Sequence, residues 1–269
     1  MPVYFFALSQ VNHINWLDAV IVFAILHLLV YPASNGYNSY MDRDISPIGG
    51  LKNPLQPTRQ LFFVTVFLDI LAIVSSFIIS WPFALGVFLY IMASRAYSYR
   101  NIRLKQYPVI GYLTVVVFQG AVTFFLVYHG TDSNHTLHVP VISAIAASLL
   151  IGGFYPLTQV YQHEEDMKDG VKTISYTLGY TGTFIFTGIV YALAFGTLAV
   201  QFFLNLELKE FFILQTCMLP VLIYFFIWFR KVVKNKKEAN FTNTMRMNLL
   251  ASVCTNIGFI IILIIRLVE

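Results

Sequence analysis

Two short segments of the chain carry identical or chemically similar polar residues at a constant offset of 124 positions. The first is YPASNGYNSYMD, residues 31–42, and the second is YPLTQVYQHEED, residues 155–166. Each copy ends with a carboxamide four residues before a carboxylate, which places both side chains on one face of a helix. The pairs are Asn38 with Asp42 and Gln162 with Asp166. Because polar groups are costly inside apolar helices, their recurrence favours one shared site over chance agreement.

Carboxylate and carboxamide oxygens are ligands that suit Mg²⁺, which commonly shares its coordination shell with a substrate phosphate. Basic residues that could neutralise such a phosphate stand beside the two copies and on the loop between them: Arg43, Arg103, Lys105, Lys168 and Lys172. This arrangement predicts a metal-bridged phosphate or diphosphate. The alternative is a set of interfacial salt bridges at helix ends, and it is the better interpretation for Lys234–Lys237.

The composition indicates that membrane helices hold these residues in place. Of the 269 residues, 58% are hydrophobic and only 11% are charged, and the mean hydropathy is +0.71. A soluble domain carries about 25% charged residues. The composition therefore excludes a cytosolic globular protein, a disordered chain and a nucleic-acid-binding domain, and it predicts a polytopic membrane protein.

Eight apolar windows predict full transmembrane helices. They cover residues 14–40, 60–80, 82–94, 108–128, 139–161, 180–204, 211–229 and 247–265. We therefore expect an all-α membrane helix bundle that forms a single transmembrane domain over residues 1–269. Residues 2–11 are apolar but too short to cross a bilayer, and we interpret them as the remnant of a ninth, N-terminal helix.

The basic residues predict how this bundle is oriented. If the first full helix runs from outside to inside, 15 of the 17 Lys and Arg residues fall on inside loops, as the positive-inside rule requires. Both repeat copies then end on the cytoplasmic face. We expect an integral, multi-pass membrane protein, in the inner membrane if the cell is bacterial, with Met1 outside and the motif loops in the cytoplasm.

Three segments give the chain a resemblance to the UbiA superfamily of intramembrane prenyltransferases. NSYMDRD, residues 38–44, is similar to the first aspartate-rich motif of the family, and QHEEDMKDGVKTISYTLG, residues 162–179, resembles the second. AYSYRNIRLKQYPVIGYL, residues 96–113, resembles the basic loop between them. The order and spacing agree over nearly the whole chain. Ser46 and Gln162 depart from the motifs, because the family has acids at these two places.

The resemblance implies nine helices, Mg²⁺ as the cofactor, and transfer of an isoprenoid chain from a prenyl diphosphate to a hydrophobic acceptor. That acceptor is often aromatic, such as a quinone or pigment precursor. The expected partners are thus a prenyl diphosphate, an aromatic or hydrophobic acceptor and membrane lipid, and nucleic acid is not among them.

The resemblance also assigns roles to single residues. The expected catalytic metal ligands are Asn38, Asp42 and Asp166, and the residues expected to replace the missing acids are Asp44, Gln162 and Glu165. The leaving diphosphate is expected to bind Arg43, Arg103, Lys105 and Lys172, with Lys168 as a weaker candidate. Aromatic faces stabilise cations, and the rings expected to face the allylic cation are those of Tyr37 and Tyr161.

Two other functions remain open from the sequence. A non-catalytic prenyl-lipid-binding homologue is suggested by Ser46 and Gln162, where acids of the family are replaced. A cation-coupled transporter is suggested by the parallel repeats and by Asp69 in the middle of a predicted membrane helix. Transporters bind their substrates near the bilayer midplane, whereas the polar clusters of this chain lie at one face, and this weighs against transport.

Overall fold

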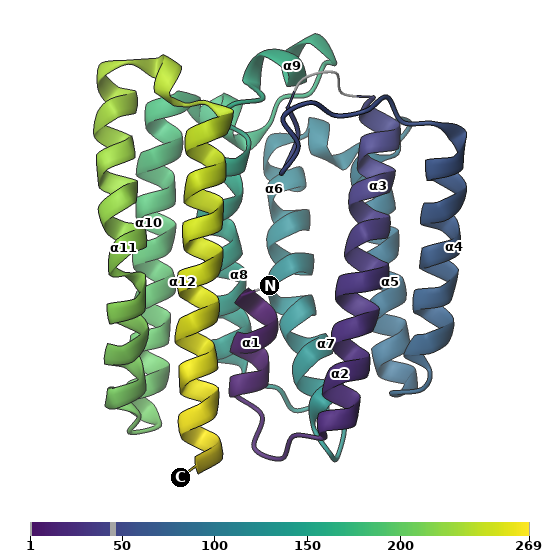
Figure 1. The fold of residues 1–269 in the computed structure, drawn as a ribbon, viewed down its shortest axis with the longest axis vertical. Helices are drawn as coiled ribbons and strands as arrows, with labels where there is room; N and C mark the ends of the chain where they lie inside the picture. The colour runs from purple at the N-terminus through teal and green to yellow at the C-terminus, as the bar shows by residue number, and fades with distance from the viewer. Residues whose placement is uncertain (1, 44–46, 269) are drawn as a thin grey trace.

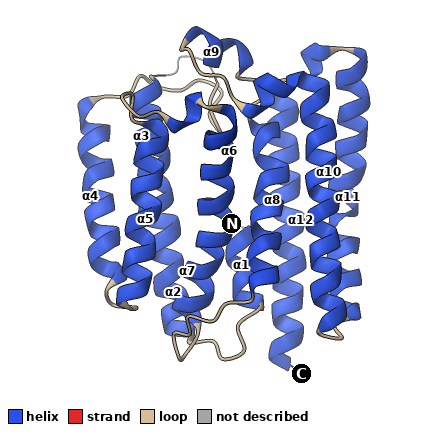
Figure 2. Cartoon of the chain, turned by 180° about the vertical axis from the view of Figure 1, so that it is seen from behind, coloured by secondary structure: helices blue, strands red, loops and turns tan. Residues whose placement is uncertain are grey.

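The computed structural model describes residues 2–43 and 47–268, which form helices joined by loops, with no strand among them. Figures 1 and 2 show the long helices side by side in one bundle. The prediction of an all-α helix bundle is confirmed. The helices of the bundle are α1 (Pro2–Ser9), α2 (Trp16–Ala24), α3 (Tyr31–Asp42), α4 (Arg59–Ser76), α5 (Trp81–Ser98), α6 (Pro108–Val116), α7 (Thr123–Thr131), α8 (Val141–Thr158), α9 (His163–Lys168), α10 (Ile174–Leu204), α11 (Leu208–Lys234) and α12 (Phe241–Val268).

Two of the membrane helices are continuous through a π-helical turn. Residues Ile25–Val30 join α2 to α3, and residues Val117–Val122 join α6 to α7. The first of these turns ends at Val30, two residues before Pro32. A proline inside a helix removes a hydrogen bond and clashes with the carbonyl four residues earlier, and a π-helical turn is one way for a helix to accommodate such a break. The first repeat copy therefore stays helical through its proline.

The second repeat copy is built differently. Pro156 lies inside α8, which ends two residues later at Thr158. Residues 159–162 form a turn, and α9 begins at His163. The Asp166 N–H still donates to the Gln162 carbonyl at 2.9 Å, so the two residues keep the helical i,i+4 spacing that the sequence predicts.

Seven helices in the described part of the chain are long and apolar enough to cross a membrane: Trp16–Asp42, Arg59–Ser76, Pro108–Thr131, Val141–Thr158, Ile174–Leu204, Leu208–Lys234 and Phe241–Val268. They match seven of the eight predicted crossings. The remaining prediction, at 82–94, falls in the 18-residue helix α5, which is not among the seven. The chain is therefore an integral, multi-pass membrane protein, while the count of eight crossings and the orientation of the loops stay predictions.

Most of the apolar segment 2–11, which we interpret from the sequence as a helix remnant, forms the helix α1. It packs against α12 and α7, and Phe6, which is fully buried, stacks on Phe259 with ring centroids 4.5 Å apart. Large apolar side chains on the outer helices are exposed instead, for example Phe67 on α4 and Ile223 on α11. Such an apolar outer surface is what a lipid-facing bundle requires.

Asp69, which suggested transport, is part of an ion pair between α4 and α5. The Arg95 Nε donates to the Asp69 Oδ2 at 2.7 Å, and the Arg95 Nη1 donates to Thr65 at 3.3 Å. A carboxylate that already has its cation on the neighbouring helix serves to join the two helices. This pairing removes the observation that favoured a transported ion at Asp69.

Candidate functional site

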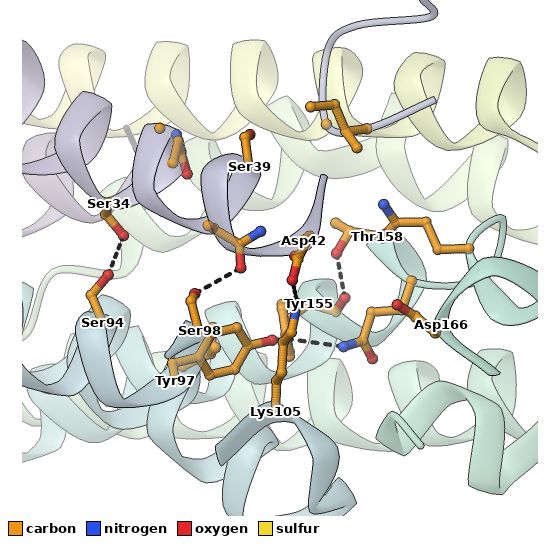
Figure 3. Close-up of a pocket in the computed structure, with 18 of the residues that line it drawn as sticks. Ser34, Ser39, Asp42, Ser94, Tyr97, Ser98, Lys105, Tyr155, Thr158 and Asp166 are labelled. Carbon is orange, nitrogen blue, oxygen red and sulfur yellow. Dashed lines mark hydrogen bonds and ion pairs between the residues drawn. The ribbon is translucent and has the colours of Figure 1, made fainter. Parts of the chain in front are cut away.

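Both repeat copies line one large cavity at the end of the bundle where α9 lies (Figure 1). The cavity has a volume of about 900 Å³. Asn38 and Asp42 line it from α3, and Gln162 and Asp166 line it from the turn before α9 and from α9 itself. Figure 3 shows Asp42, Lys105 and Asp166 around this space. Residues 124 positions apart are thus brought together, as the repeat predicts.

Lys105 neutralises Asp42 from within the cavity wall. Its Nζ donates to the Asp42 Oδ1, and the Arg103 Nη2 lies 3.6 Å from the same oxygen. The side chains of Lys105 and Asp42 are only 9% and 7% exposed. A buried charge is tolerated when it is paired, so each of these residues depends on the other.

Local backbone geometry places Lys105 at the cavity. Arg103 has a left-handed conformation, with φ 45°, directly before the 3₁₀ turn Leu104–Gln106. This turn packs tightly on α6, because a Cβ at Gly111 would lie 2.9 Å from the Cα of Lys105. Only a glycine leaves room for this contact, and it holds the start of α6 and the backbone of Lys105 together.

The basic loop also binds the segment that directly follows the second repeat copy. The Arg103 Nη2 forms an ion pair with the Asp169 Oδ2, and its Nη1 donates to the Asp169 carbonyl at 3.1 Å. Arg100 connects this segment to the first copy, because its Nη1 lies 3.6 Å from the Asp169 Oδ1 and its Nε donates to the Met41 carbonyl at 2.8 Å. Asp169 holds the basic loop in place, a role that the sequence did not assign to it, although it lies in the segment 162–179 that resembles the second aspartate-rich motif.

Asn38 is oriented by the neighbouring helix α5. Its Oδ1 accepts a hydrogen bond from the Ser98 hydroxyl at 2.7 Å, and one helical turn away Ser34 and Ser94 are linked at 2.6 Å. A carbonyl oxygen has two lone pairs. The bond to Ser98 therefore fixes the amide and leaves the oxygen able to bind a cation in the cavity.

The structure does not bring every predicted residue to the cavity. Glu165 is 29% exposed and lies 3.9 Å from Lys168, whose side chain is 75% exposed. Arg43 ends α3 in a left-handed conformation and is exposed, as is Lys172. None of these four residues lines the cavity. Asp44, the remaining predicted ligand, lies outside the described residues.

The two predicted tyrosines have different surroundings. Tyr161 lines the cavity and packs edge-on against Phe241 with ring centroids 5.4 Å apart. Tyr37 does not line it, because its ring faces the Arg95 guanidinium, whose carbon lies 3.8 Å from the ring centroid. The face of Tyr37 that was predicted to stabilise an allylic cation is therefore covered by a cation of the protein.

A neutral histidine anchors α9 above the cavity. The His163 Nε2 is hydrogen-bonded to the Ser175 hydroxyl at 2.8 Å, and its ring stacks on Tyr180 with centroids 4.7 Å apart. Burial lowers the pKa of His163 to about 4, because a charged imidazolium loses its hydration there. At neutral pH this side chain carries no charge, so it positions the start of α9 without adding to the charge of the site.

A hydrogen-bonded chain of three side chains forms part of the cavity wall, and the sequence did not identify it as part of a site. The Gln159 Nε2 donates to the Tyr155 hydroxyl at 2.9 Å, and the Tyr155 hydroxyl is hydrogen-bonded to that of Tyr97 on α5 (Figure 3). All three residues line the cavity. The available signal was the spacing of Tyr155 and Gln159, two polar residues four positions apart at the end of an apolar helix.

The side chains that line the cavity suit Mg²⁺, which needs few protein ligands, better than a metal ion that only protein side chains coordinate. Within residues 2–43 and 47–268, no three His, Cys, Asp or Glu side chains form a group that could hold a metal ion. The two repeat copies instead give the cavity two carboxylates, Asp42 and Asp166, and two carboxamides, Asn38 and Gln162, together with the buried Lys105. Mg²⁺ is usually bound by one or two carboxylates and completes its shell with waters and phosphate oxygens, which this cavity accommodates.

Known proteins share both the sequence pattern and the fold. The model of the UbiA prenyltransferase family matches residues 1–250. The apo structure of a UbiA homologue from Aeropyrum pernix K1 has a TM-score of 0.70 at 16% identity, with 97% of this chain and 95% of that chain covered. A UbiA homologue from Archaeoglobus fulgidus bound to DMAPP and Mg²⁺ has a TM-score of 0.65 at 20% identity, with coverage of 97% and 93%.

A structure of digeranylgeranylglyceryl phosphate synthase in membranes has a TM-score of 0.62 at 18% identity, with 98% of this chain and 91% of that chain covered. None of the curated proteins matches the chain. At these identities the structural similarity concerns the fold, which in each case extends over nearly the whole of both chains.

Proposed function

This chain belongs to the UbiA prenyltransferase family, and from this premise we propose that it transfers an isoprenoid chain from a prenyl diphosphate to an aromatic acceptor at the cavity, with Mg²⁺ as cofactor. The proposal rests on the observation that both repeat copies line the same cavity. Asp42 and Asp166 line one cavity together with the buried Lys105. Two carboxylates and a lysine are the groups that a magnesium diphosphate requires.

Four cavity residues would hold Mg²⁺: Asn38, Asp42, Gln162 and Asp166. Mg²⁺, when bound, supplies Lewis-acid stabilisation of the negative charge on the diphosphate. This assignment is supported by the A. fulgidus homologue, which binds DMAPP or GPP together with Mg²⁺. Glu165 remains a candidate only if α9 moves, because in the present arrangement it lies beside Lys168 and away from the cavity.

The transfer replaces one bond of the prenyl carbon by another. The C–O bond between C1 of the prenyl chain and the diphosphate breaks, and both electrons leave with the diphosphate. An electron pair of the acceptor forms the new bond to C1, and the acceptor loses the proton that the prenyl group replaces. Lys105 holds the leaving diphosphate, and the rings of Tyr90 and Phe118, which line the cavity with centroids 6.3 Å apart, provide an apolar wall for the chain.

The proposal is tested by measuring diphosphate release in lipid nanodiscs. The substrates are geranyl, farnesyl and geranylgeranyl diphosphate, each offered with a panel of aromatic acceptors. We expect release that needs both Mg²⁺ and an acceptor and that stops when EDTA removes the metal. Binding of the prenyl diphosphates without any release would favour a non-catalytic prenyl-lipid-binding homologue, and absence of both would contradict the proposal.

Replacing Lys105 by methionine should weaken prenyl diphosphate binding more than it slows the chemical step. A lysine that contacts the diphosphate stabilises ground and transition states alike, which raises KM and leaves kcat nearly unchanged. We expect a rise in KM of only about tenfold, because Lys105 already bonds to Asp42 in the free protein and exchanges one anionic partner for another. Methionine is unbranched and keeps most of the length of the buried lysine side chain while it removes the charge.

The matched control for this variant is Lys236→Met, which removes an exposed lysine from the turn before α12. Its kinetics should match those of the wild type. A Lys105→Met variant with unchanged KM and a strongly reduced kcat would show that the lysine acts on the transition state alone.

A further inference from the structure

One polar atom in the cavity wall has no hydrogen-bond partner among the described residues: the side-chain carbonyl oxygen of Gln159. Gln159 is only 7% exposed, and its Nε2 is bound to the Tyr155 hydroxyl at 2.9 Å. An amide whose nitrogen is held in this way is left with its carbonyl as a free acceptor. Buried polar atoms are nearly always paired, so an unpaired one requires an explanation.

The location of this atom distinguishes it from the other unpaired side-chain atoms of the described part. Those atoms belong to residues such as Ser143, Thr187 and Asn256, which do not line the large cavity. Gln159 alone among them does. Gln159 therefore contacts the cavity while its carbonyl oxygen is covered in the free protein, and a ligand that pairs with this oxygen has to bring a hydrogen-bond donor.

The backbone places Gln159 beside the residues that would hold the metal. The backbone N–H of Gln162 donates to the main-chain carbonyl of Gln159 at 3.0 Å, within the turn that joins α8 to α9. The reacting carbon of a prenyl diphosphate is bonded directly to a diphosphate oxygen. The acceptor must approach that carbon, so its reacting end comes to lie within this same part of the cavity.

The side chain of Gln159 is also held in a fixed direction. Its partner Tyr155 is hydrogen-bonded to Tyr97 on α5, and the Tyr155 carbonyl accepts a hydrogen bond from Thr158 at 2.7 Å. The bond between the two tyrosines connects the end of α8 to α5, and the bond from Thr158 lies within α8. A fixed acceptor selects ligands far better than a mobile one, because its orientation is already determined before binding.

From this geometry we infer that Gln159 is a specificity-determining residue that accepts a hydrogen bond from a donor group on the prenyl acceptor, next to the carbon that is prenylated. The inference rests on the proposed function. Gln159 selects acceptors that carry a hydroxyl or N–H at this position over molecules of the same shape that lack this donor. With a hydroxylated ring, the hydrogen bond to Gln159 would also draw the hydroxyl proton toward the amide and make the ring carbons more electron-rich.

The test compares two probes that differ only in the donor, 1-naphthol and 1-fluoronaphthalene. Equilibrium dialysis against protein-loaded nanodiscs, with empty nanodiscs as the blank for partitioning into lipid, gives the Kd of each probe. Mg²⁺ and the unreactive geranyl thiolodiphosphate are present, so that no turnover occurs. We expect the wild-type protein to prefer 1-naphthol by about tenfold or more, since the probe without a donor leaves a buried acceptor unpaired.

Two variants identify the residue responsible. In Gln159→Met the preference should fall to less than about twofold, whereas the matched control Gln119→Met, a glutamine that lines the same cavity from the π-helical turn Val117–Val122, should keep the wild-type ratio. Gln159→Glu should retain or increase the preference, because a carboxylate is a stronger acceptor. This variant also tests the inference if the methionine variant does not fold.

Equal Kd values for the two probes in the wild type, or an unchanged ratio in Gln159→Met, would overturn the inference. A separate titration with geranyl thiolodiphosphate alone distinguishes this failure from that of the proposed function. If the thiolodiphosphate does not bind in the presence of Mg²⁺, the proposed function fails; if it binds and the probes are not discriminated, only the role of Gln159 fails.

Discussion

Asp166→Ala is expected to reduce Mg²⁺-dependent diphosphate release by about 100-fold or more while the helices remain folded. The carboxylate is one of two that line the cavity from opposite repeat copies, and its loss removes a ligand that organises Mg²⁺ where charge develops on the leaving group. Single-turnover release of diphosphate from geranyl diphosphate in nanodiscs measures the effect on the chemical step.

The matched control is Glu164→Ala, two residues earlier on the same short helix α9. Glu164 is exposed and does not line the cavity, so its removal should leave the rate within about twofold of the wild type. If Asp166→Ala retained most of the wild-type rate, the second repeat copy would be structural and the assignment of the metal site would be wrong.

The repeat in the sequence predicted the centre of the candidate site because it recorded polar residues that apolar helices rarely contain. Asn38, Asp42, Gln162 and Asp166 all line the cavity. The i,i+4 spacing predicts only that two side chains share a helical face. The apolar windows supplied the rest of the prediction, since two parallel helix ends four crossings apart must open on the same surface.

The orientation of a side chain that depends on a neighbouring helix could not be predicted from the sequence. Tyr37 precedes Asn38 by one residue, which rotates its side chain by about 100° around the helix axis and directs it to Arg95 instead of the cavity. The sequence offered no way to see that Arg95 bonds to Asp69. A pairing between two helices is a tertiary contact that periodicity within either helix does not encode.

The basic loop shows a second limit of sequence patterns. Proximity in sequence suggested five cations for the diphosphate, yet only Lys105 among them lines the cavity. The left-handed backbone of Arg103 and the contact at Gly111 decide this outcome. Non-glycine residues adopt such a conformation rarely, so the turn that buries Lys105 could not be inferred from residue types.

The final expectation concerns the two carboxylates together. Asp42→Ala alone should also reduce diphosphate release by about 100-fold or more. It has a further effect, because it leaves the buried Lys105 without its carboxylate partner. Removing one member of a buried pair destabilises a protein strongly, so the thermal unfolding midpoint in nanodiscs must be measured beside the rate.

The double variant Asp42→Ala, Asp166→Ala separates a shared site from two independent ones. If each carboxylate acted alone, the two losses would multiply to about 10⁴-fold. If both organise one magnesium diphosphate, the first substitution already disables the unit, and the double variant should be slower than either single variant by no more than about threefold. Rates are compared at saturating geranyl diphosphate and at a temperature well below the lowest unfolding midpoint. A multiplicative loss would mean that the two repeat copies contribute to the reaction separately, even though their side chains line the same cavity.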